Sequence, residues 1–214
     1  AERELTAAMQ YDPMETEAAS ALVDLERVEH RYDFARNALA AQLRHLEKAE
    51  DTTAPEKRSR ALVATHLLLA NVSEMGLNNP EAAEKEYNKA LEIAPDRLAI
   101  WTNFARFALD NKRLDQFNVA IAQTCGKLLS ENKEVPPNVA AVYRVLQKGP
   151  GELDGATEML LAVVRGYKAG NSLSAAQAFG WTARLLLEYA RSAPPETPGL
   201  CTAFFNLGIV FSGL

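Results

Sequence analysis

Apolar residues recur at intervals of three and four along most of this chain, which is the spacing of one face of an α-helix. The pattern is clearest in residues 82–95, where one face is built from Ala83, Tyr87, Ala90 and Leu91. The alanines let a neighbouring helix approach closely. Pro95 ends the helix because proline cannot continue the hydrogen-bond ladder. The sequence therefore predicts a helix here that packs tightly against another helix.

This helical pattern repeats at fixed offsets. A step of 34 residues leads from Leu67 to Trp101, where a Trp-x-x-Phe-Ala motif opens another helix. A step back of 48 residues leads from Ala83 to Ala35, and a further step of 34 leads to Ala1. Self-similarity of this kind predicts a repeat protein made of stacked helix pairs.

The repeat pattern and the breaks between helices predict about eleven helices in an all-α chain. A polar segment at 50–58 is expected to be an inserted loop. The predicted divisions are the second helix of a truncated repeat at 1–13, repeat-like hairpins at 16–50, 57–95, 98–130 and 137–169, and a divergent C-terminal hairpin, or the start of a further repeat, at 172–214.

These motifs resemble the tetratricopeptide repeat (TPR) family, whose 34-residue pattern combines Trp-x2-Leu-Gly-x2-Tyr, Ala-x3-Phe and a proline. The residues that carry the resemblance are Ala83, Tyr87, Ala90, Pro95 and Trp101. The resemblance implies a single α-solenoid of antiparallel helix hairpins over residues 1–214, coiled as a right-handed superhelix. It also implies a scaffold that binds another protein or a peptide.

In the usual arrangement of that family, the first helices of successive hairpins line a groove. The resemblance places ten groove residues in this chain: Asp24, Arg27, Leu68, Val72, Met75, Thr102, Asn103, Arg106, Asn138 and Val145. Asn103 and Arg106 have the character of the clamp with which some members hold acidic C-terminal peptides, but most of the clamp is missing. The apolar middle at Leu68, Val72 and Met75 suits an amphipathic helix or an extended apolar segment.

Composition and charge narrow the class of partner. The net charge of -5 is modest and both signs are interspersed, so nucleic acid is not expected to bind. The apolar fraction of 48% and the aromatic fraction of only 7% favour helix over sheet. Apolar runs are too short to span a bilayer, so this segment is not expected to insert into a membrane. Cys125 and Cys201 lie in apolar helical contexts and are expected to be buried free thiols.

Catalytic and metal-binding patterns are missing from the sequence. His30, His45 and His66 have none of the short spacings that bring two ligands onto one helix face. Cys125 has no neighbouring histidine to activate it as a nucleophile. The sequence therefore predicts no enzyme, no cofactor and no metal site.

Two further interpretations remain open beside the scaffold. In the first, these residues are the regulatory or positioning solenoid of a larger enzyme or of a membrane or envelope assembly, such as polysaccharide or secretion machinery. In the second, residues 200–214 mediate self-association, because this helix is apolar nearly all round. Since residues 1–13 look like half of a hairpin, the chain is expected to be part of a longer protein, on either the cytoplasmic or the periplasmic side.

Overall fold

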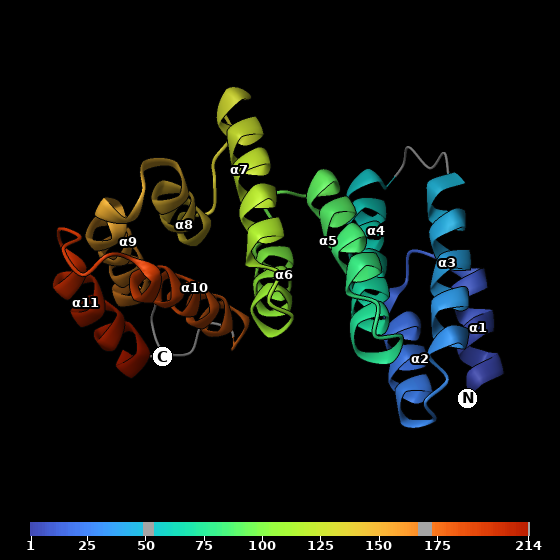
Figure 1. Cartoon of the computed structure of the whole chain (residues 1–214). Helices are drawn as coiled ribbons and strands as arrows, with labels where there is room; N and C mark the ends of the chain where they lie inside the picture. Colours follow the sequence, from blue (N-terminus) through green and yellow to red (C-terminus); the bar gives the residue numbers. More distant parts are fainter. Residues whose placement is uncertain (49–53, 167–172, 214) are drawn as a thin grey trace. The chain divides into compact units, whose positions relative to one another are not determined.

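The computed structural model describes residues 1–48, 54–166 and 173–213 (Figure 1). Regular structure in these residues is entirely helical, with eleven α-helices, one π-helical turn and one 3-10 turn, and no strands. This confirms the all-α prediction and the expected number of helices. The helices form two compact units, Ala1–Pro95 (unit 1) and Asp96–Leu214 (unit 2). Whether both belong to one continuous solenoid stays a prediction.

Unit 1 contains helices that pack against their neighbours in sequence, and α2 also packs against α4. Asn79 caps α5 with its side chain and Pro80 occupies the first turn. Pro55 already starts α4, so residues 55–58 are helical and the predicted loop at 50–58 is too long; residues 49–53 lie outside the described part. The elements are α1 (Glu2–Tyr11), α2 (Thr16–Val28), α3 (Tyr32–Lys48), α4 (Pro55–Asn71), η1 (Val72–Gly76) and α5 (Pro80–Ile93).

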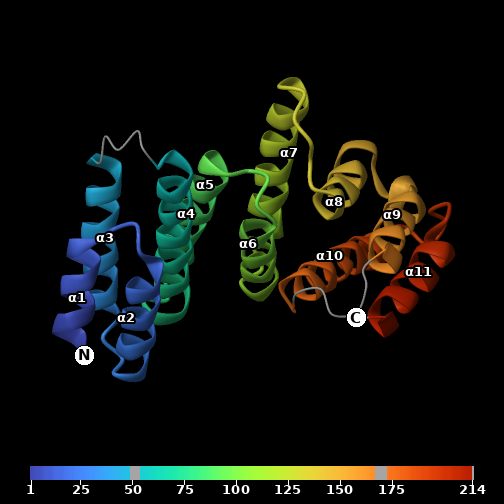
Figure 2. The same ribbon diagram turned by 180° about the vertical axis from the view of Figure 1, so that it is seen from behind.

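Unit 2 is closed by α10, which packs against α6, α8, α9 and α11 (Figures 1 and 2). Its aromatic core stacks Phe104 against Phe117, with ring centroids 5.1 Å apart, and Trp101 against Phe117 at 6.2 Å. The elements are α6 (Leu98–Asp110), α7 (Leu114–Ser130), α8 (Pro137–Lys148), η2 (Pro150–Glu152), α9 (Leu153–Gly166), α10 (Leu173–Ser192) and α11 (Leu200–Gly213).

The corners after α2, η1 and α6 share one backbone conformation. His30, Asn78 and Lys112 have φ values of 56°, 47° and 57°, in the left-handed region. After His30 and Lys112 the next amide donates to a carbonyl five residues back, from Arg31 to Glu26 and from Arg113 to Ala108, which is the bond of a Schellman cap. The three corners are 48 and 34 residues apart, the same offsets that align the sequence repeats.

Candidate interaction surface

The solvent-facing side of α2 is a continuous row of residues at helical spacing. Its members are Glu17, Ser20, Ala21, Asp24, Arg27 and Val28, and all are exposed. Asp24 and Arg27 form an ion pair of 3.1 Å between Oδ1 and Nη2. Such an exposed pair contributes little stability. Both predicted groove residues on α2 are therefore accessible to a ligand.

At the end of α4, only part of the predicted apolar middle of the groove is accessible. Leu68 is half-buried and Met75 is 59% exposed, whereas Val72 is 1% exposed and belongs to the core. A π-helical turn begins at Val72, and its wider winding separates Val72 from the face that carries Met75. The Asn71 side-chain amide lies 3.5 Å from the Met75 sulfur. Val72 is thus not a groove residue.

In unit 2, the predicted groove residues of α6 are half-buried and bonded within their own helix. Thr102 and Asn103 donate to the carbonyls of Leu98 and Ala99, at 2.9 and 2.8 Å. Arg106 pairs with Asp110 at 3.3 Å. These side chains are held along the helix by bonds that a ligand would have to replace.

The remaining predicted groove residues of unit 2 lie on α8, which packs against α7, α9 and α10. Asn138 and Val145 of α8 are buried, and the Asn138 amide donates to the Thr182 hydroxyl of α10 at 3.3 Å. A narrow enclosed gap between α10 and α6 is lined by Trp101, Thr102 and Trp181, among others. Asn138 and Val145 are therefore internal, which corrects their assignment to an open groove. The sequence pattern identifies α10 as a helix but carries no signal for where it packs.

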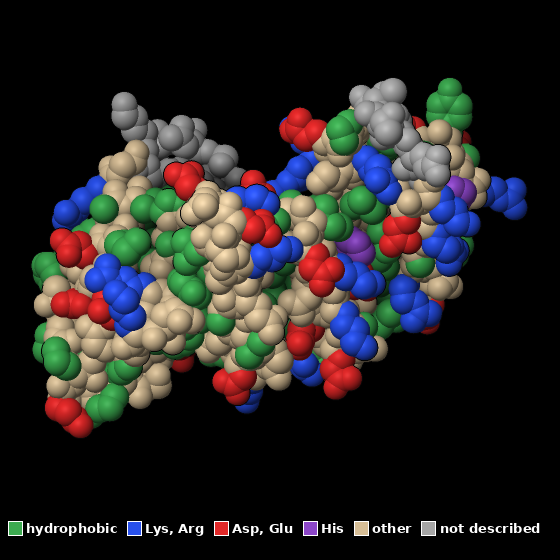
Figure 3. All heavy atoms as spheres, turned by 90° about the horizontal axis from the view of Figure 1, so that it is seen from above, with side chains coloured by type: hydrophobic (Ala, Val, Ile, Leu, Met, Phe, Trp, Pro, Cys, Tyr) green, Lys and Arg blue, Asp and Glu red, His purple; other side chains and the backbone are tan. Residues whose placement is uncertain are grey.

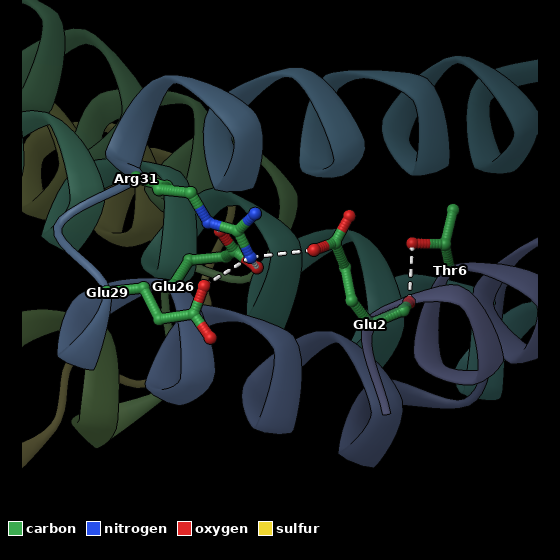
Figure 4. Close-up of polar contacts among 5 residues, drawn as sticks. All are labelled: Glu2, Thr6, Glu26, Glu29 and Arg31. Atoms are coloured by element: carbon green, nitrogen blue, oxygen red, sulfur yellow. Dashed lines mark hydrogen bonds and ion pairs between the residues drawn. The ribbon is translucent and has the colours of Figure 1, made fainter.

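A charge cluster at the first corner was not predicted from the sequence (Figure 4). Arg31 Nη2 lies 2.6 Å from both Glu2 Oε2 and Glu29 Oε2, and its Nε lies 2.9 Å from Glu26 Oε2. The Glu26 side chain has no exposed surface. Its Oε2 is not aligned for a hydrogen bond, so the attraction there is mainly electrostatic. The cluster ties α1 to the corner between α2 and α3.

Burial raises the pKa of Glu26 above its usual value of 4.5, and the nearby Glu2 and Glu29 add to this, while Arg31 opposes it. A carboxyl whose pKa is raised by folding makes the protein lose stability as pH rises from the unfolded to the folded pKa. Glu26→Gln should therefore flatten the pH dependence of stability above about pH 4.5, whereas Arg31→Ala should steepen it. Urea unfolding at several pH values measures both slopes.

The matched control for this pH experiment is Glu29→Gln, which removes an exposed carboxylate from the same guanidinium. Because Glu29 adds to the raised pKa of Glu26, the slope of this variant should lie between those of the wild type and of Glu26→Gln. In the double variant Arg31→Ala, Glu26→Gln, the free energy of unfolding should no longer show the steeper pH dependence expected of Arg31→Ala alone. Equal slopes in the wild type and in Glu26→Gln would show that Glu26 does not titrate as its burial implies.

His66 and Glu86 form a buried pair between α4 and α5, with Nδ1 donating to Oε2 at 2.6 Å. Burial raises the pKa of Glu86, but hydrogen bonds from His66 and Lys89 outweigh it and bring that pKa below its usual value. His66 makes no other polar contact with the described residues, and its side chain is only 4% exposed. A substrate cannot reach this ring, so the pair acts as a link between two helices.

The two cysteines differ in their burial. Cys125 is buried, as predicted, and burial raises the pKa of its thiol to about 12. Cys201 is exposed, contrary to the prediction, because it faces away from the helices that α11 packs against. No group of three His, Cys, Asp or Glu residues is placed to hold a metal ion among the residues described.

Comparisons with known proteins found no matching family model, no matching curated protein and no matching solved structure. Within the described ranges, none of the helices has the length and apolar character needed to cross a bilayer. On the face seen in Figure 3, Lys and Arg side chains are interspersed with Asp and Glu.

Proposed function

We propose that the protein is a non-enzymatic scaffold with a TPR-like solenoid arrangement, and that unit 1 binds a protein or peptide segment. One observation carries this proposal. α2 and α4, the first helices of two successive predicted hairpins, pack against each other, and each presents accessible side chains. The recurring corners at 34- and 48-residue offsets support the repeat interpretation.

The binding surface proposed here consists of the exposed row of α2 and the accessible end of α4 and η1. The α2 row offers both signs of charge at Asp24 and Arg27. Leu68 and Met75 add apolar area at the end of α4 and in η1. Methionine also adapts its shape to different ligands. A segment with charged residues along one edge and one or two apolar anchors fits this combination.

We place the binding surface on unit 1 rather than unit 2 because the predicted groove residues of the two units differ in how they are covered. In unit 2, α10 already packs against α6 and α8, the helices that carry the predicted groove residues. A ligand there would have to displace a helix with several fully buried side chains, including Ala183 and Leu186. On α2, by contrast, the predicted residues are open to solvent.

The proposal is tested by selecting peptides from a displayed library on the full chain and measuring their affinity by fluorescence anisotropy. Met75→Glu and Arg27→Glu should each weaken binding by about tenfold or more, as expected when a contact residue at an interface is reversed. Lys85→Glu is the matched control, because Lys85 is exposed on α5, away from the proposed surface. Selected peptides that bind all three variants equally would contradict the proposal.

A further inference from the structure

The outward side of α11 is unusual for a surface helix. Phe205 is 68% exposed, and Phe204 and Phe211 are each 41% exposed. With Cys201, Gly208 and Ser212 they follow a spacing of three and four, so they share one side of the helix, here called the α11 outer face.

α11 buries a polar residue and exposes large apolar ones. Asn206 is buried and its amide donates to the Thr157 hydroxyl of α9 at 3.3 Å, while three phenylalanines point to solvent. Residues 200–213 include no charged side chain, whereas each of the other ten α-helices of the described chain carries at least two. An uncharged aromatic face of this kind is typical of a protein interface.

The order of large and small residues on this face is self-complementary. Small side chains at Cys201, Gly208 and Ser212 alternate with the large rings of Phe205 and Phe211. If a second copy runs antiparallel about an axis between residues 206 and 207, Phe205 of each copy lies over Gly208 of the other. Phe211 then lies opposite Thr202, so two of the three rings meet a small residue, and Phe204 lies opposite Ile209.

A second copy fits the face in charge as well as in shape. Neither α11 helix brings a charge, so no charged group loses its hydration when the two faces meet. The surface at Gly208 is open, because a Cβ atom built there has no neighbour within 4 Å. In a dimer with two-fold symmetry each contact also occurs twice, which is how isologous dimers gain stability.

We propose that the α11 outer face is a homodimer interface in which two antiparallel α11 helices pack about an axis between residues 206 and 207, with Phe205 of each copy over Gly208 of the other. The interface leaves the proposed peptide-binding surface of unit 1 unused. Either assignment can therefore fail without the other.

Sedimentation analysis of the full chain tests the proposal, and the wild type should be a dimer. Gly208→Leu should weaken dimerisation by about tenfold or more, because the new side chain occupies the place of the partner's Phe205. Gly126→Leu is the matched control, since Gly126 is also a helical glycine with open space at its Cβ. Circular dichroism should show unchanged helix content for both variants.

The antiparallel direction is tested by mild oxidation of Ser212→Cys. In that variant Cys201 of one copy lies opposite residue 212 of the other, so a disulfide-linked dimer should form. The wild type should not cross-link, because the two Cys201 residues lie at opposite ends of the interface. A monomeric wild type, a Gly208→Leu dimer as strong as the wild type, or a cross-link between the two Cys201 residues would each overturn the proposal.

Discussion

Phe104→Ala is expected to lower the free energy of unfolding of the chain by about 3 to 5 kcal/mol, the usual cost of removing a buried phenylalanine ring. Phe104 has no exposed surface, and its ring lies edge-on to Phe117 and tilted against Phe107. The surrounding rings come from two helices, α6 and α7, and they can close only part of the cavity. This makes Phe104 one of the most sensitive positions in unit 2.

Urea unfolding followed by tryptophan fluorescence measures this loss, because both tryptophans, Trp101 and Trp181, belong to unit 2. Val119→Ala is the control in the same unit, since Val119 is an exposed apolar residue of α7. Its effect should stay within about 0.5 kcal/mol. A loss below about 1 kcal/mol for Phe104→Ala would mean that the ring is not packed as described.

Gly76→Ala is expected to destabilise unit 1 by about 1 to 3 kcal/mol, the usual cost of overpacking a core. A Cβ atom at Gly76 would lie 2.1 Å from Cδ1 and Cγ of Tyr32 and 2.7 Å from its Cβ. These atoms are the root of the tyrosine side chain, so a small rotation cannot relieve the clash. Urea unfolding followed by far-ultraviolet circular dichroism measures the effect.

A double-mutant cycle identifies the cause of that loss. If the Tyr32 ring is the main obstacle, Gly76→Ala should cost less in a Tyr32→Ala background, where only the contact with the Cβ atom of residue 32 remains, and the two changes should be non-additive. Gly126→Ala serves as control, because alanine there meets open space and is a better helix former than glycine. Additive losses at Gly76 and Tyr32 would refute the explanation.

Helix positions were predictable because they depend on local signals. The three-and-four spacing and the prolines place the starts of α5 at Pro80 and α6 at Leu98, in agreement with the structure. The groove assignment, which came from the resemblance, was wrong at Val72, where a π-helical turn begins and the number of residues per turn changes. Assigning residues to a helix face from their spacing requires the same number of residues per turn throughout the helix.

The placement of helices that are distant in sequence was not predictable in the same way. Asn138 and Val145 are buried where α8 packs against α7, α9 and α10, and nothing in the local pattern of α8 specifies those contacts. Glu26 is similar, because its burial depends on a guanidinium that follows it after a corner. Asp24 and Arg27 are exposed on α2, and their assignment to a groove stays a prediction.

The left-handed corners at His30, Asn78 and Lys112 supply a fingerprint for finding distant relatives of this chain. β-Branched side chains are strongly disfavoured at such backbone angles, whereas glycine and asparagine accept them. Homologues that have lost every other trace of similarity should therefore still avoid valine, isoleucine and threonine at these three sites. A sequence search that penalises these three residue types at the three sites, and that uses the 48- and 34-residue intervals, would detect relatives that overall identity no longer reveals.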